Sequence, residues 1–187
     1  MHYDWQRQIA QATVSEWFTV AAYAIAALCT AAAAIRAGSL DSGKEHLFWW
    51  SSTILLVLLA FNDVADLQTL LTEQAKIIAI ADGWYESRRT VQFWFILSLM
   101  AGAVLAGAAG LWLSAGTHAG VRIALAGLGF IVVFVIDRAA SFHHLDEWLG
   151  SGSPILDYGA IQEMIGIAIV GFAAALYTRE SGKRRRR

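Results

Sequence analysis

The chain alternates between long apolar runs and short polar stretches. Five runs are long enough to cross a membrane, which takes roughly 20 helical residues for about 30 Å of hydrocarbon. They lack the alternation of barrel strands, and only helices or closed barrels satisfy backbone hydrogen bonds inside lipid. The pattern therefore predicts an all-α protein, an integral membrane five-helix bundle that forms a single transmembrane domain over residues 1–187. We expect the spans at about 18–35, 47–71, 91–114, 123–142 and 155–177.

Lysine and arginine set the expected orientation, because translocation disfavours them and they remain on the cytoplasmic side. If the basic tail at 183–187 lies inside, Arg36, Lys44 and Arg122 also lie inside. With five spans, the N-terminus is then outside and the C-terminus cytoplasmic. We expect a multi-pass protein of a bacterial inner membrane, in contact with membrane lipids.

The polar stretch between the second and third spans has a pattern of its own. In "TEQAKIIAIADGWYESRR", apolar residues recur at helical spacing, with Ile77, Ile78, Ala81 and Trp84 on one side. This predicts an extra amphipathic helical segment that extends the second span or lies in the membrane interface. Aromatic residues at headgroup level and two neighbouring arginines indicate a lipid or anion site, formed by Trp84, Tyr85, Arg88 and Arg89.

Composition supports the membrane assignment and excludes other classes. Hydrophobic residues make up 57% of the chain and charged residues 16%, and the mean hydropathy is +0.51, unlike a soluble globular domain. The net charge of −1 leaves no broad basic face for nucleic acid. The single cysteine, Cys29, lies in an apolar run and is interpreted as a packing residue.

Polar residues enter the spans near their expected outer ends. At 1.5 Å per residue, Asp63, Asp137 and Glu163 each lie on the order of 10 Å below the outer surface, in one layer. Ionisable groups inside a span are costly and face the bundle interior or a wet cavity. Gly166 shares a helix face with Glu163, so a neighbouring helix can come close there. The pattern predicts a ligand pocket at the outer leaflet, lined by Asn62, Asp63, Asp66, Asp137, Arg138, Ser141, Gln162 and Glu163.

Carboxylates and imidazoles in this layer also raise the hypothesis of a divalent metal site, since both groups bind zinc, iron or manganese. The chain has neither an HExxH pattern nor a Glu-x-x-His pair. Haem is not expected, because His46 and His118 fall on the cytoplasmic side and the other paired histidines fall outside. The candidate metal ligands are Asp66, Asp137, His143, His144, Glu147 and Glu163.

Two interpretations of the polar layer remain open. In one, Arg138 neutralises a carboxylate and the other groups only fix which helices pair. In the other, four acids at one depth exceed the single in-layer cation and need a proton, an interfacial arginine or a bound cation. The chain carries no nucleotide-binding loop, nucleophile elbow or CxxC motif.

Ligand or metal-ion binding at the outer leaflet is therefore the leading functional hypothesis, and two others stay open. One is an accessory subunit of a larger membrane complex. The spacing Gly102-x3-Ala106-x3-Gly110 is typical of a close-packing helix face, within the bundle, in a homo-oligomer or in such a complex. The other is a membrane enzyme that acts on a lipid-like substrate.

Overall fold

The computed structural model describes residues 14–65, 74, 76–83, 87–140 and 158–184. This part of the chain holds five long helices and no strand, so the all-α class is confirmed for it. Residues 76–81 are also helical, within the expected amphipathic segment, and there Ala79 is buried while Ile77 and Ile78 are exposed. The long helices are α2 (Val14–Gly38), α3 (Gly43–Ala65), α5 (Arg88–Leu113), α6 (Ala119–Ala140) and α8 (Tyr158–Arg184).

Four of these helices contain a stretch long and apolar enough to cross a membrane, which supports the membrane assignment. α3 is not among them, and its described residues carry Lys44 and Glu45 at one end and Asp63 at the other. The four stretches are Glu16–Gly38, Phe93–Trp112, Ala119–Ile136 and Ala160–Ser181.

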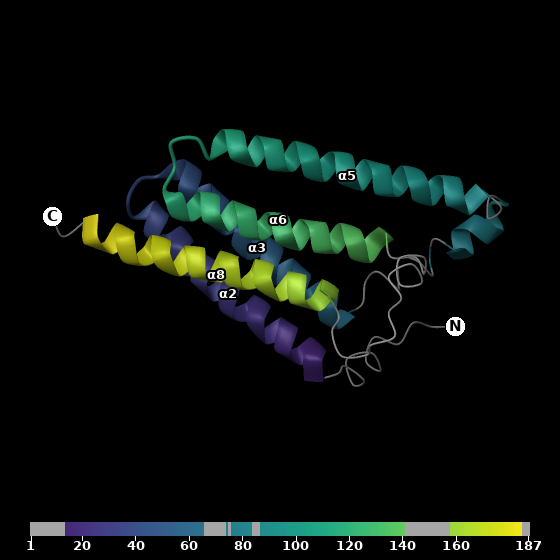
Figure 1. Ribbon diagram of the computed structural model, residues 1–187, viewed down its shortest axis with the longest axis horizontal. Helices are drawn as coiled ribbons and strands as arrows, with labels where there is room; N and C mark the ends of the chain where they lie inside the picture. Colours follow the sequence, from purple (N-terminus) through teal and green to yellow (C-terminus); the bar gives the residue numbers. More distant parts are fainter. Residues whose placement is uncertain (1–13, 66–73, 75, 84–86, 141–157, 185–187) are drawn as a thin grey trace.

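α2, α3, α6 and α8 lie together, and α5 runs along the edge of the bundle beside α6 (Figure 1). One end of the molecule carries two short turns, 39–42 between α2 and α3 and 114–118 between α5 and α6, together with the last residues of α8. We call it the turn end, and the opposite end the far end. The first turn accommodates Asp41 at a positive φ of 56°, a conformation that aspartate tolerates better than most residues.

The core at the turn end is built from the small face of α2 against large aromatic residues. Ala33, Ala34 and Ala37 are fully buried and pack with Trp49 of α3 and Tyr177 of α8. The Trp49 and Tyr177 ring centroids are 5.3 Å apart. The many alanines of α2 therefore let two aromatic side chains fit inside the bundle. Towards the far end, the core continues with Tyr23, Leu56, Ile131 and Val170.

α6 and α8 approach each other closely at Gly127 and Gly166. A methyl group added to Gly127 would lie 2.9 Å from the Gly166 carbonyl oxygen, and one added to Gly166 would lie 2.7 Å from Ile131 Cγ1. Both distances are shorter than van der Waals contact. The expectation that small residues beside Glu163 admit a neighbouring helix is therefore confirmed at Gly166.

The predicted close-packing face of α5 behaves differently along its length. An added Cβ at Gly110 would meet Leu125 of α6 at 2.9 Å, whereas one at Gly102 would meet nothing within 4 Å. The apolar stretch of α5 has 0% of its residues buried, against 33% to 39% for the other three. α5 thus packs on α6 near the turn end and leaves most of its apolar surface exposed.

Candidate functional site

Two side-chain pairs, Tyr23 with Glu163 and Asp63 with Arg138, lie in the half of the bundle towards the far end. The Tyr23 hydroxyl of α2 donates a hydrogen bond of 2.7 Å to Glu163 Oε1 of α8. Tyr23 is 1% exposed and Glu163 is 6% exposed, so this bond lies inside the bundle. Asp63 and Arg138 both interact electrostatically with the Tyr23 hydroxyl. We call these four residues the Tyr23–Glu163 cluster.

Arg138 and Asp63 form the charged, outer part of the cluster. Arg138 Nη1 of α6 lies 3.6 Å from Asp63 Oδ1 of α3. The Asp63 side chain is 9% exposed, whereas that of Arg138 is 40% exposed. The guanidinium therefore connects a buried carboxylate to the surface of the far end, where another anionic group could reach it.

The structure brings together three residues of the predicted layer, Asp63, Arg138 and Glu163. Gln162 lies next to them but turns to α6, where its Nε2 donates to the Phe130 carbonyl oxygen at 3.3 Å. Asn62 is half-buried on α3. For Asp137, Arg88 and Arg89 the structure describes the backbone alone. The other predicted site residues lie outside the described residues: Asp66, Trp84, Tyr85, Ser141, His143, His144 and Glu147.

Among the side chains that the structure describes, no group of three His, Cys, Asp or Glu residues is arranged to hold a metal ion. Most of the predicted metal ligands are not in that part of the chain. The described cluster consists of two carboxylates, a guanidinium and a phenol. These groups bind polar molecules through charge and hydrogen bonds.

Tyr23 is the cluster member that the sequence analysis missed, because it lies in an apolar run with no charged neighbour. Its spacing carries a signal, since Tyr23 and Thr30 are seven residues apart and share one face of α2. Thr30 accepts a hydrogen bond of 2.9 Å from Thr53 of α3. The hydroxyl-bearing residues of α2 thus lie on the face that turns inward.

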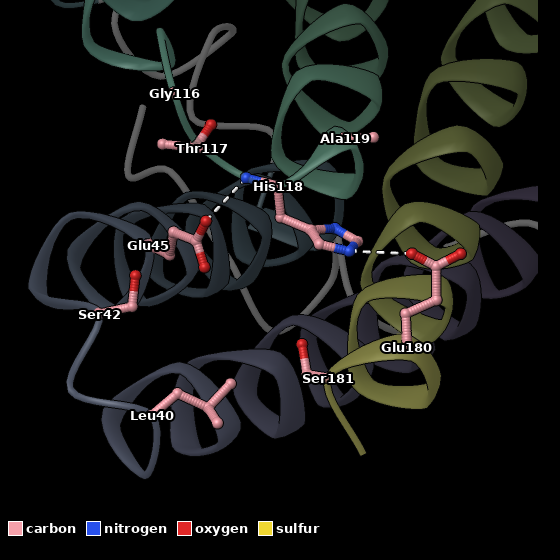
Figure 2. A pocket seen from close by; sticks show the side chains of 9 residues that line it. All are labelled: Leu40, Ser42, Glu45, Gly116, Thr117, His118, Ala119, Glu180 and Ser181. Atoms are coloured by element: carbon pink, nitrogen blue, oxygen red, sulfur yellow. Dashed lines mark hydrogen bonds and ion pairs between the residues drawn. The ribbon is translucent and has the colours of Figure 1, made fainter. Parts of the chain in front are cut away.

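A second polar site lies at the turn end, where no site was predicted. A pocket of about 620 Å³ opens there between α3, α6 and α8 (Figure 2). Figure 2 shows Glu45 and Glu180 on either side of His118. The pocket is lined by Leu40, Ser42, Glu45, Gly116, Thr117, His118, Ala119, Glu180 and Ser181.

The Glu45 carboxylate is held by two donors in this pocket. Its Oε1 accepts the backbone N–H of His118 at 2.7 Å, and its Oε2 accepts the Tyr177 hydroxyl at 2.6 Å. His118 directly precedes α6, so the carboxylate lies at the N-terminus of that helix, where the helix dipole favours negative charge. Glu45 therefore joins α3 to both α6 and α8.

The hydrogen bonds of the His118 ring define its tautomer. Nδ1 accepts the backbone N–H of Gly120 at 3.0 Å, which caps the first turn of α6. Nδ1 is then unprotonated, so Nε2 carries the hydrogen and donates to Glu180 Oε2 at 2.9 Å. His118 is a neutral imidazole in this arrangement. The sequence analysis placed it in a cytoplasmic loop and gave it no role, because its partners come from distant helices.

Comparison with protein-family models, with curated proteins and with solved structures finds no match for this chain.

Proposed function

We propose that this multi-pass membrane protein binds a small polar ligand in the Tyr23–Glu163 cluster. The observation that carries the proposal is the buried hydrogen bond of 2.7 Å between Tyr23 and Glu163, which joins α2 and α8. In the proposed topology, the N-terminus and the far end face outside, and the basic C-terminus is cytoplasmic. The ligand then enters from the outer leaflet.

The cost of the cluster favours binding over helix pairing. An ionisable side chain inside a span costs from about 2.5 kcal/mol upward on insertion scales. The same bundle pairs α2 with α3 through two neutral hydroxyls, Thr53 and Thr30, 2.9 Å apart. The pairing of α2 with α3 at these threonines thus needs no charged group, and a function that uses the charged groups of the cluster would explain their presence.

The charges of the cluster indicate the chemistry of the ligand. Glu163 and Asp63 would accept hydrogen bonds from an ammonium, amide or hydroxyl group. The half-exposed Arg138 would bind a carboxylate or phosphate oxygen. A metal ion is the alternative occupant, in which case Asp66, Asp137, His143, His144 and Glu147 would add ligands to Glu163.

Changing Tyr23 to phenylalanine tests this proposal with the smallest alteration. Removal of the hydroxyl abolishes the hydrogen bond that positions the Glu163 carboxylate. We therefore expect the affinity for a ligand that contacts Glu163 to fall about tenfold or more. The measurement is native mass spectrometry of the protein from native membranes in nanodiscs, followed by identification of the small molecules it retains. Tyr177→Phe is the matched control, since it removes the corresponding Tyr–Glu hydrogen bond at the turn end.

Equal retention by wild type, Tyr23→Phe and Glu163→Gln would contradict ligand binding at this cluster. It would support the interpretation in which the four residues only pair helices, especially if both variants melt at a lower temperature. Elemental analysis of the same samples separates the two occupants. A stoichiometric metal that Glu163→Gln removes would identify the metal ion as the ligand.

The proposed topology has its own test. In a Cys29→Ala background, single cysteines replace Ser39 in the turn-end loop and Ala81 beyond α3, both of which are exposed. We expect a membrane-impermeant maleimide to label Ala81→Cys in intact cells and Ser39→Cys only after lysis. The opposite pattern would place the Tyr23–Glu163 cluster near the cytoplasmic side.

A second candidate function, that of an accessory subunit in a membrane complex, is favoured by α5. Its large apolar side chains are exposed, including Val104 at 70% and Leu105 at 71%. A cysteine at position 104 that forms a specific crosslink to one partner polypeptide in native membranes would support this candidate. Crosslinks to lipid alone would leave α5 as a lipid-facing helix.

A further inference from the structure

We propose that the turn-end pocket is a second binding site, for a small organic cation that carries an ammonium or guanidinium group. The site lies at the opposite end of the bundle from the Tyr23–Glu163 cluster. It shares no residue with that cluster. The inference therefore does not depend on the function proposed above.

The charge of the lining favours a cation. Two of the nine lining residues are glutamates and none is lysine or arginine. Arg36 lies beside the pocket, where its Nη2 donates to the Ser181 carbonyl oxygen at 3.3 Å. One guanidinium bound to a backbone oxygen does not cancel two carboxylates. The charged side chains that line the pocket itself are thus both carboxylates.

The hydrogen bonds of His118 add no further charge to the lining. Its Nδ1 accepts from Gly120 and its Nε2–H donates to Glu180, so the ring is neutral and adds no positive charge. A helix N-terminus would otherwise attract an anion. Here the Glu45 carboxylate already occupies that position at the start of α6. An anionic ligand would meet two carboxylates and an already capped helix.

The size of the pocket favours an organic molecule over a bare metal ion. Its volume of about 620 Å³ falls within the range of small-molecule sites, roughly 300 to 1,000 Å³. Across the described part of the chain, no three His, Cys, Asp or Glu side chains are arranged around a metal position. Leu40, Gly116 and Ala119 add apolar surface that would contact the carbon skeleton of an organic cation.

The two carboxylates differ in how firmly they are held, which suggests separate roles. Glu45 is fixed by Tyr177 and by the start of α6, and each of its oxygens retains a second lone pair for a ligand. The Glu180 side chain is 57% exposed and is held by His118. Glu45 would form the rigid inner contact, and Glu180 the contact at the mouth of the pocket.

Isothermal titration of the purified protein with 1,4-diaminobutane tests the inference, and 1,4-butanediol serves as the uncharged ligand of similar size. We expect saturable binding of one diamine per chain and no saturable binding of the diol. Glu180→Gln should weaken diamine binding about tenfold or more, because it removes one charge–charge hydrogen bond. Asp82→Asn is the matched control, since Asp82 is exposed and lies outside the pocket lining. It should leave the affinity unchanged.

The inference is overturned if the diamine does not bind saturably, or if the diol binds equally well. Tighter binding of Mg²⁺ than of the diamine would overturn it too, because the pocket would then be an ion site. Glu45→Gln is measured together with its melting temperature, since Glu45 also joins three helices. Because Glu180 is exposed, Glu180→Gln gives an answer even if Glu45→Gln fails to fold. Loss of diamine binding in Tyr23→Phe would show that the two sites are not separate.

Discussion

Replacement of Trp49 by alanine should lower the free energy of unfolding by about 3 kcal/mol, the lower end of the range for a buried tryptophan. Trp49 is 0% exposed and lies against Tyr177, with ring centroids 5.3 Å apart. Lipid solvates an indole ring as well as the bundle interior does, so most of the loss comes from packing contacts and the cavity left behind. The measurement is equilibrium unfolding in mixed micelles.

Trp50 provides a matched control one position along the same helix. Its side chain is 39% exposed, so Trp50→Ala removes the same atoms from a site that lipid or detergent can fill. We expect a change below about 1 kcal/mol, as for substitutions outside the core. Similar losses for the two variants would contradict the burial of Trp49 against α2, α6 and α8. They would also show that Trp49 does not hold the ring of Tyr177, whose hydroxyl donates to Glu45.

Replacement of Gly166 by alanine should destabilise the protein by about 1–3 kcal/mol, the usual range for overpacking a core. The new methyl group would lie 2.7 Å from Ile131 Cγ1, 3.0 Å from the Gly127 carbonyl oxygen and 3.2 Å from the Ile131 nitrogen. Two of these three atoms belong to the backbone of α6, so rotation of a side chain cannot relieve the overlap. α8 would have to move away from α6.

Gly129→Ala is the control on the facing helix, because a Cβ there meets nothing within 4 Å. Alanine is the better helix former by up to about 1 kcal/mol, so this variant should be neutral or slightly stabilised. A neutral Gly166→Ala would show that the two helices are not in close contact. Glu163 lies three residues from Gly166 on the same face of α8. Gly166→Ala should therefore also reduce the ligand retained by the Tyr23–Glu163 cluster.

The predicted site was partly visible in the sequence because charged residues inside apolar runs are rare and costly. Asp63, Asp137 and Glu163 could be assigned to one layer from their depths, with Arg138 as its cation, and the structure pairs Arg138 with Asp63 and Glu163 with Tyr23. Tyr23 could not be assigned in the same way. A phenol is tolerated in an apolar helix, so nothing in the local sequence shows that its hydroxyl meets a carboxylate from α8.

The turn-end pocket was not predicted, for a related reason. Polar residues near turns are usually solvated, so Glu45, His118 and Glu180 have no unusual local pattern. Their importance comes from tertiary contacts, since hydrogen bonds join α3 to α6 and to α8 through Glu45 and join α6 to α8 through His118. These contacts form only when α3, α6 and α8 lie side by side.

The sequence by itself determined that this protein is helical and that four of the five expected spans are long and apolar enough to enter a membrane, because transfer free energies accumulate residue by residue along a segment. Only the tertiary structure decided which helix faces meet. Lipid and helix surfaces are similarly apolar, so hydrophobicity does not select one rotation of a helix over another. Close approach at Gly127 and Gly166 and a few directed hydrogen bonds make that selection here. The same physics leaves α5 at the edge of the bundle, where its apolar surface stays exposed.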